Sequence, residues 1–288
     1  MDILQANQHI ARLDHNARHR SVPFAEGRVM RWRIFGQGDP LVIIHGGHGS
    51  WLHWIRNIEA LSRDHLLLVP DLPGFGDSDD PPAGSGMQTI VDALITSLDT
   101  VLGDRCVIDL AGFSFGGVVS ARVALQRGAV RRLALLGSPG SATPRRSRDP
   151  LMRWRNADEA AQNTALRHNL LAHMMYAESN VDALAFRAYA DSIKGARFRS
   201  RGSAHRVPLK EILAPYPDPV LFLYGEHDVI CTPEMARISL ANATAHRECR
   251  VVAGGGHWIQ FERADEVNAA LTHWFGVGAA QPAVALTS

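Results

Sequence analysis

A serine between two glycines carries the clearest chemical signal in this chain of 288 residues. Gly112, Ser114 and Gly116 form a G-x-S-x-G pattern between an apolar run at 106–110 and a helical run at 118–126. In such a pattern a strand turns sharply into a helix, and the glycines leave room for the turn while the serine hydroxyl stands clear. Free N–H groups at the helix start favour negative charge there. We therefore expect Ser114 to be a nucleophile.

A serine hydroxyl needs an adjacent base, and that base needs an acid to orient it. For this type of turn the acid and then the histidine follow the serine along the chain. Asp228 and His257 follow Ser114 in that order, each just past an apolar run, and position selects His257 among 14 histidines. Glu226 and His227 compete with Asp228 by proximity, but Asp228 has the usual Gly-x-x-Asp spacing. We expect a triad of Ser114, His257 and Asp228.

The negative charge of a tetrahedral intermediate requires two preorganised backbone donors. We expect one from Phe115, directly after the nucleophile, and the other from Gly47 in the turn that follows the apolar run at 41–44. Histidines at positions 45, 48 and 53 surround that turn, but their spacing matches no zinc pattern and carboxylates are absent nearby. We therefore expect neither a metal nor a cofactor.

Strand-like apolar runs alternate with helical runs around these residues, which predicts an α/β protein with a doubly wound, mostly parallel sheet. Ligands of such sheets bind beyond the carboxyl ends of the strands, where all the motifs fall. Residues 1–20 are expected to form a weakly docked arm, and residues 276–288 a loose tail. Strands are expected at 29–35, 41–44, 66–69, 106–110, 133–136, 219–224 and 250–252, and helices at 51–61, 89–102, 118–126, 234–240 and 265–275.

The alternation stops between 143 and 210, where the composition is helical. We interpret 143–210 as a cap domain inserted into a core domain of 1–142 and 211–288. The cap holds 13 Lys and Arg against 6 Asp and Glu, which leaves the rest of the chain at −6. This charge is either a solvated face paired with acidic groups of the core or a bias toward anionic substrates. The apolar face of the cap should come from Leu170, Leu171, Met174 and Met175.

Composition excludes several classes of function. A net charge of +1 offers no bulk electrostatic case for nucleic acid, and three scattered cysteines suit a reducing compartment. We find no apolar segment of a signal peptide and no run approaching the ~20 apolar residues of a membrane helix. We expect a cytoplasmic protein with a small-molecule substrate and no membrane partner. The oligomeric state stays open, a homodimer included.

Taken together, these motifs resemble the α/β-hydrolase family over nearly the whole chain. The matching positions are 45–47, 71–78, 112–117, Asp228 and His257. Within the family, 257–262 and 265–268 resemble the meta-cleavage-product hydrolases. That resemblance implies cleavage of a carbon–carbon bond in ring-fission products of aromatic catabolism. It also implies a cap arginine that holds the acidic end of the substrate, and Arg187 is placed for this role.

Two departures from that subfamily bear on the substrate. Phe113 stands where an asparagine usually precedes the nucleophile, and His48 follows Gly47 in the oxyanion loop. Loss of the polar group at 113 favours hydrolysis of a small or medium carboxylic ester over carbon–carbon cleavage. A non-catalytic ligand-binding member of the fold is the third alternative. We expect Phe113, His48, Arg187 and Trp258 to border the substrate, although Trp258 could instead be a packing aromatic.

Overall fold

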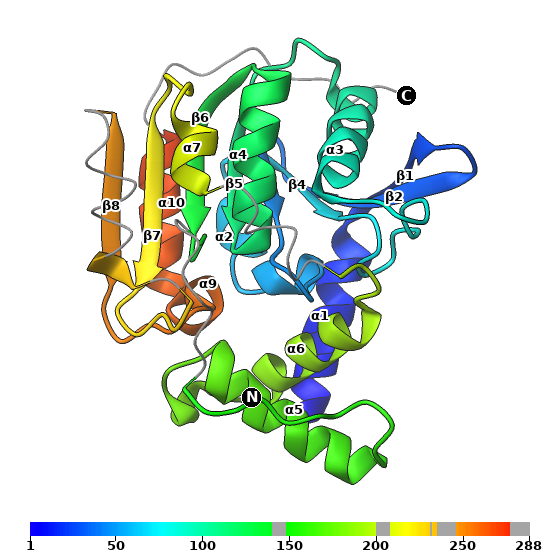
Figure 1. The fold of residues 1–288 in the computed structure, drawn as a ribbon, viewed down its shortest axis with the longest axis vertical. Helices are drawn as coiled ribbons and strands as arrows, with labels where there is room; N and C mark the ends of the chain where they lie inside the picture. The colour runs from blue at the N-terminus through cyan, green and yellow to red at the C-terminus, as the bar shows by residue number, and fades with distance from the viewer. Residues whose placement is uncertain (140–147, 200–207, 231, 235–245, 277–288) are drawn as a thin grey trace.

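The computed structural model describes residues 1–139, 148–199, 208–230, 232–234 and 246–276. Their strands form one sheet in the order β1-β2-β4-β3-β5-β6-β7-β8 (Figure 1). The pairs β1–β2 and β2–β4 are antiparallel, and every other neighbouring pair is parallel. The strands are β1 (Arg18–Ala25), β2 (Arg28–Phe35), β3 (Asp39–Ile44), β4 (His65–Asp71), β5 (Ile108–Phe113), β6 (Val130–Leu136), β7 (Val220–Gly225) and β8 (Arg247–Val252).

Helices cover both faces of the sheet, so the prediction of a doubly wound α/β protein is confirmed (Figure 1). One face packs against α3, α4 and α7, and the other against α2 and α10. The helices are α1 (Ile3–Asn16), η1 (Trp51–Trp54), α2 (Ile58–Leu61), α3 (Met87–Leu102), α4 (Phe115–Arg127), α5 (Glu159–His173), η2 (Glu178–Asn180), α6 (Ala183–Gly195), α7 (Leu209–Leu213), α9 (Ile259–Glu262) and α10 (Ala264–Gly276), η1 and η2 being short 3₁₀ turns.

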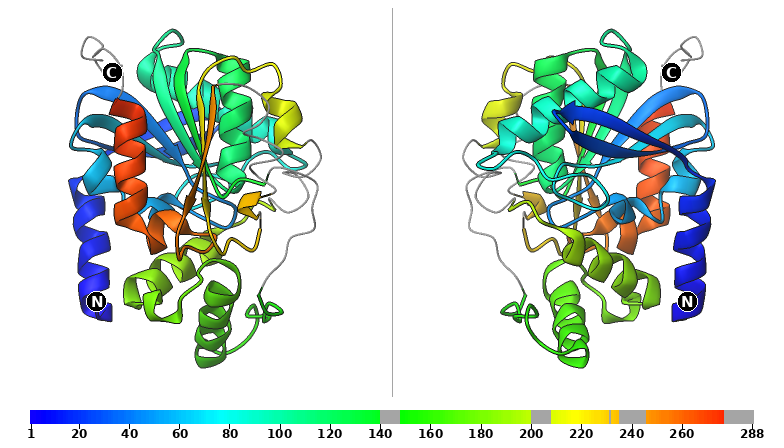
Figure 2. Two further views of the ribbon diagram at one scale, coloured as in Figure 1. Left: turned by 90° about the vertical axis from the view of Figure 1, so that its left-hand side faces the viewer. Right: turned by 90° about the vertical axis from the view of Figure 1, so that its right-hand side faces the viewer.

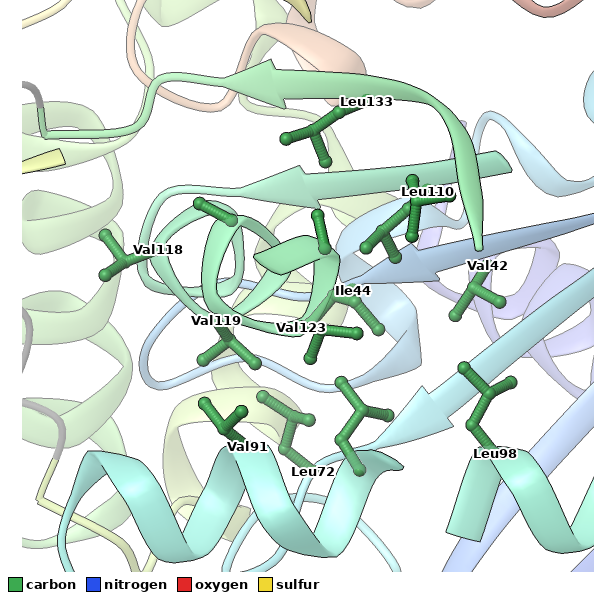
Figure 3. Packing of buried hydrophobic residues seen from close by; sticks show 14 of the residues in the cluster. Val42, Ile44, Leu72, Val91, Leu98, Leu110, Val118, Val119, Val123 and Leu133 are labelled. Carbon is green, nitrogen blue, oxygen red and sulfur yellow. The ribbon is translucent and has the colours of Figure 1, made fainter. Parts of the chain in front are cut away.

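The central strands are apolar on both faces because both faces are covered. Figure 3 shows how side chains of three strands meet the helix that follows the candidate nucleophile. Val42, Leu110 and Leu133 come from β3, β5 and β6, and Val119 and Val123 come from α4; all are buried. This packing holds the end of β5 and the start of α4 in a fixed relation.

The amino-terminal arm is a firmly docked helix, which corrects the expectation of a weakly docked one. Ala6 and Leu13 of α1 are buried, and Asp2 caps the helix through a reciprocal capping box with Gln5. The Nε of Arg33 in β2 lies 2.6 Å from a carboxylate oxygen of Asp14. Figure 2 shows α1 at the outer edge of the molecule.

Two local expectations differ from the structure. The predicted helix at 51–61 consists of two short pieces, η1 and α2, joined by a turn at 55–57. Asn57 in this turn is fully buried, and its side-chain amide donates to Asn268 at 2.7 Å. Strand β1 was not predicted. It forms an antiparallel hairpin with β2, and only Val22 of its eight residues is buried, so it lacks the apolar pattern of a buried strand.

The segment 148–199 is helical and contains no strand among the residues described there. Helices α5 and α6 lie at the end of the molecule toward which the arrows of β6 and β7 point (Figure 1). Arg197 of this segment pairs with Asp80 of the sheet region, as expected of a basic face paired with acidic groups, whereas Asp182 pairs with Arg56 in the opposite sense. The expected boundary at 210 lies within α7, whose Leu209 and Leu213 pack in the same apolar cluster as the sheet. The expected boundary at 143 falls in 140–147, outside the described residues. The same holds for 277–288 and most of the helix expected at 234–240.

A helix that crosses a bilayer needs about 20 consecutive apolar residues, and the described helices are shorter. None of those within the described ranges is long and apolar enough to cross a bilayer.

Candidate active site

Ser114 lies at the turn between β5 and α4, with a backbone φ of +52° that few residues other than glycine adopt. The neighbouring glycines permit this turn by close approach. A Cβ at Gly112 would overlap the carbonyl oxygen of Gly116 and the hydroxyl of Ser120, and one at Gly116 would overlap the carbonyl oxygen of His45. The strained backbone places the serine side chain beyond the carboxyl end of β5.

Three side chains from distant parts of the sequence form a continuous hydrogen-bonded chain. The Oγ of Ser114 lies 3.0 Å from Nε2 of His257, and Nδ1 of His257 lies 3.0 Å from each carboxylate oxygen of Asp228. An ionised carboxylate only accepts hydrogen bonds, so Nδ1 carries the proton and Nε2 is left to accept from the serine hydroxyl. All three side chains are buried.

The structure also places the two residues that competed with Asp228. The carboxylate of Glu226 is exposed and accepts a hydrogen bond from the N–H of Gly254 at 2.9 Å. The ring of His227 stacks on Tyr176 with 3.5 Å between centroids. Among the three, the structure brings Asp228 to Nδ1 of the histidine.

The turn expected to supply one oxyanion donor is held by two buried histidines. Nδ1 of His45 donates to the carbonyl of Gly46 at 2.8 Å, because its Nε2 accepts from the N–H of Leu72 at 3.0 Å. Nδ1 of His53 accepts from the N–H of Gly46 at 3.1 Å. Burial lowers the pKa of His45 and lowers that of His53 well below its usual value, so both rings are neutral. Gly47 directly follows this braced position.

The second expected donor is the N–H of Phe115, which is the first residue of α4 and follows Ser114 directly. At a helix start the first N–H groups have no intrahelical acceptor, so they are available to a ligand. His48 directly follows Gly47 in the turn after β3, with a backbone φ of +60°. Phe115 thus directly follows the serine at the start of α4, and the turn with Gly47 also lies close to the serine, because a Cβ at Gly46 would overlap the ring of Phe113.

A buried ion-pair network supports the same turn from the side of β2 and β4. The carboxylate of Asp71 accepts from the N–H of Trp51 at 2.7 Å, from the N–H of Asp77 at 3.1 Å and from Nη1 of Arg33 at 3.1 Å. Arg33 also pairs with Asp77 and Asp14, and its guanidinium lies 4.4 Å from the Trp51 ring centroid. Residues 71–78, which resemble the family pattern, therefore have a structural role, because they hold the turn that follows β3.

Two predicted substrate residues are aromatic and buried. Phe113 packs with its ring centroid 4.9 Å from that of His257 and 5.3 Å from that of His53, so it presents an apolar surface beside the histidine. Trp258 is fully buried, donates from Nε1 to the carbonyl of His53 at 2.9 Å and packs on Phe261. These contacts favour the packing alternative, and contact between Trp258 and a substrate stays a prediction.

Arg187 does not lie where the resemblance to the meta-cleavage-product hydrolases implies. Its Nε pairs with Asp191 one turn further along α6 at 2.7 Å, and its side chain is 46% exposed. It lines a cavity of about 410 Å³ between α1 and α6, whose described lining contains none of Ser114, His257 and Asp228. An i, i+4 partner on the same helix is the local reason for this orientation.

The helical segment 148–199 brings a residue near this site that the sequence did not indicate. His173, the last residue of α5, places its ring centroid 6.0 Å from that of His257. No local pattern distinguishes it from the other histidines, because only the docking of α5 brings the two rings together. Within the described ranges, no group of three or more His, Cys, Asp or Glu side chains is arranged to hold a metal ion.

Comparison with known proteins places this site in context. The family model of the alpha/beta hydrolase fold matches residues 39–264. A 2-hydroxymuconate semialdehyde hydrolase of Pseudomonas sp. (strain CF600) is 28% identical over 246 residues, which cover 80% of this chain and 84% of that protein. The dihydrolipoyllysine-residue acetyltransferase component of an acetoin cleaving system from Pseudomonas putida is 29% identical over 259 residues, which are 84% of this chain and 65% of that protein.

Among solved structures, an esterase from Rhodococcus sp. ECU1013 superposes with a TM-score of 0.72 at 21% identity. The superposition covers 90% of this chain and 98% of that one, which is a likeness of fold. The family match extends from the first central strand through the turn at Ser114 to the helix after His257. The chain therefore belongs to the alpha/beta hydrolase fold family.

Proposed function

We propose that this chain is a serine hydrolase that cleaves a small or medium carboxylic ester through an acyl-enzyme intermediate. The hydrogen-bonded chain from Ser114 through His257 to Asp228 carries the proposal. Its three members have the chemical roles of nucleophile, general base and orienting acid. The similar proteins described above include a hydrolase and an esterase, in keeping with this chemistry.

In the proposed acylation, Oγ of Ser114 attacks the ester carbonyl while Nε2 of His257 takes the hydroxyl proton. The negative charge that develops on the carbonyl oxygen is bound by the N–H groups of Phe115 and Gly47. The carbon–oxygen bond to the alcohol then breaks, and Nε2 of His257 gives its proton to the leaving oxygen. Asp228 stabilises the imidazolium throughout and keeps its own negative charge.

Deacylation follows the same path with water in place of the alcohol. His257 takes a proton from water, the hydroxide attacks the acyl carbon, and the carboxylic acid leaves as Oγ of Ser114 recovers its proton. These steps need no metal or cofactor. The buried, neutral His45 and His53 serve this chemistry indirectly, because they hold the turn that carries Gly47.

We also propose that 143–210 forms a cap over Ser114, with 1–142 and 211–288 as the core domain. Leu170, Met174 and Met175 are buried in the same apolar cluster as Trp258, which directly follows the proposed base. The approach of the His173 ring to that base further supports the proposal. A substrate would lie between this helical segment and the carboxyl ends of the strands.

Carbon–carbon bond cleavage of a ring-fission product is the second candidate, and the name of the 28% identical relative favours it. That reaction requires a cation for the carboxylate of the substrate. Arg187 is instead paired with Asp191 and half exposed, and Phe113 offers no polar group. These two observations place the ester first. The non-catalytic alternative would leave the aligned serine and histidine without a use.

A turnover screen tests the proposal. The wild-type chain is assayed on p-nitrophenyl esters of increasing acyl length beside a coloured ring-fission product. Ser114→Ala should lower kcat/KM by on the order of 10³-fold or more. Ser120→Ala is the matched control, a buried serine on the same helix, and should retain activity. Covalent labelling of Ser114 by a fluorophosphonate separates an active serine from a ligand-binding scaffold. Near-wild-type turnover by Ser114→Ala would refute the mechanism.

A further inference from the structure

Glu262 of α9 is a buried carboxylate that the proposed mechanism does not use. It is 7% exposed and lies five residues after the proposed base. It accepts hydrogen bonds from the backbone N–H groups of Gly256 at 2.7 Å, Ala177 at 2.8 Å and Tyr176 at 3.0 Å. The side-chain amide of Asn180 donates a fourth at 3.1 Å. One carboxylate therefore satisfies donors from two separate segments.

Those donors belong to two segments that are far apart in the sequence. Tyr176, Ala177 and Asn180 lie between α5 and the end of η2, in the proposed cap. Gly256 directly precedes the proposed base, His257. Glu262 thus joins the cap segment to the loop that carries the base.

Two further contacts show how closely these segments meet. The N–H of Trp258 donates to the carbonyl of Met174 at 2.7 Å. A Cβ at Gly256 would lie 2.6 Å from the backbone nitrogen of Tyr176 and 3.0 Å from Oε2 of Glu262. The backbone on both sides of His257 is therefore attached to residues 174–177.

The chemistry of this junction needs a carboxylate. An ionised Glu offers two acceptor oxygens and no donor, which matches four inward-pointing N–H groups. A glutamine has the same shape, but its NH₂ group would face one of these donors and leave it buried without an acceptor. Glu262→Gln therefore changes the hydrogen bonding of the junction with almost no change in volume.

We propose that Glu262 is a positioning residue that couples the docking of the cap segment to the alignment of His257. Through Gly256 it fixes the backbone of the base, and through 176–180 it fixes the cap above it. Without this carboxylate Ser114, His257 and Asp228 are all still present, but the loop that orients the imidazole of His257 is held less tightly. This inference rests on the proposed function, because it takes His257 as the base.

Kinetics of Glu262→Gln on a p-nitrophenyl ester, with the folded fraction measured by circular dichroism, test the coupling. We expect kcat per folded enzyme to fall by about 10–100-fold, the scale for a misplaced catalytic group. KM should stay within about twofold, because Phe113 and the proposed oxyanion donors are unchanged. Glu266→Gln is the matched control, since that carboxylate is half exposed and pairs with Arg263 at the surface.

Amide hydrogen exchange supplies a readout that is independent of turnover. In Glu262→Gln the amides of Gly256, Tyr176 and Ala177 should exchange faster together, while Glu266→Gln matches the wild type. If Glu262→Gln does not fold, Asn180→Ala removes one cap-side bond, and its kcat should still fall severalfold although it does not touch the loop of the base.

Two results would overturn the coupling: kcat per folded enzyme equal to that of Glu266→Gln, or faster exchange at Gly256 without a change at 176–177. A wild-type chain that hydrolyses no ester would instead refute the proposed function. In that case the joint exchange of the three amides still decides whether Glu262 holds the two segments together.

Discussion

Removing the charge of Arg33 by Arg33→Met tests how the buried charges support the turn that contains Gly47. The guanidinium is almost fully buried and pairs with the fully buried Asp71 as well as with Asp14 and Asp77. Asp71 in turn accepts the N–H of Trp51, at the far end of the turn that contains Gly47. Arg33→Met keeps the apolar stem of the side chain and removes its charge, so the variant leaves a buried carboxylate without its cation.

The structure gives the size of the expected effect. Breaking a buried ion pair by removing one partner costs about 3–5 kcal/mol, whereas an exposed pair is worth about 0–1 kcal/mol. Arg12→Met is the matched control, because Arg12 pairs with Glu59 and both side chains are about half exposed. For a chain of this size, 1 kcal/mol shifts Tm by roughly 2 °C. Arg33→Met should therefore lower Tm by roughly 6–10 °C and Arg12→Met by no more than roughly 2 °C.

The loss of stability in Arg33→Met should also depend on pH, and the direction of this dependence follows from the pKa of Asp71. Burial raises the pKa of Asp71 and Arg33 lowers it, so Arg33→Met raises the pKa of this carboxyl further. A raised folded-state pKa means that stability is lost as the pH rises through it. The gap in free energy of unfolding between Arg33→Met and the wild type should therefore be larger at about pH 8 than at about pH 5. Urea unfolding at both values measures it, and a penalty below about 1 kcal/mol or one independent of pH would refute the reasoning.

Two further predictions concern substrate charge and acid stability. Arg187→Ala should change kcat/KM on a neutral ester by less than about twofold, because the guanidinium is paired with Asp191 at the surface; a selective collapse on a carboxylate-bearing ring-fission product would instead favour carbon–carbon cleavage. The free energy of unfolding should fall as the pH drops below 6.5, because burial lowers the pKa of His45 and His53 and only the unfolded chain then binds these protons. Each ring contributes up to about 2 kcal/mol by about pH 5, and a flat profile in urea unfolding between about pH 8 and pH 5 would contradict this.

Local residue patterns determined the sheet and its central turn. The apolar runs at β3, β4, β5, β6 and β7 are visible in the sequence because strands covered on both faces are apolar throughout. The turn at Ser114 can be recognised in the sequence because neighbouring backbone atoms come so close there that only glycine fits at 112 and 116. Strand β1 escaped prediction because its pairing with β2 depends on a hairpin and not on a buried face.

Only the tertiary structure decided which side chains meet. Glu226, His227 and Asp228 all lie within three residues of the end of β7; the Gly-x-x-Asp spacing favours Asp228, and the approach of the His257 loop is what brings its carboxylate to Nδ1 of the histidine. The same holds for His173, which the docking of α5 brings near the base.

The bracing roles of His53 and Glu262 likewise appear only in three dimensions, since their partners lie in other segments of the chain. The spacing of apolar residues along the sequence indicates which face of a helix or strand is buried, because that burial depends on many neighbouring side chains together. The pairing of individual polar groups depends on angles and distances between elements far apart in the chain, and these are set only when the whole core packs.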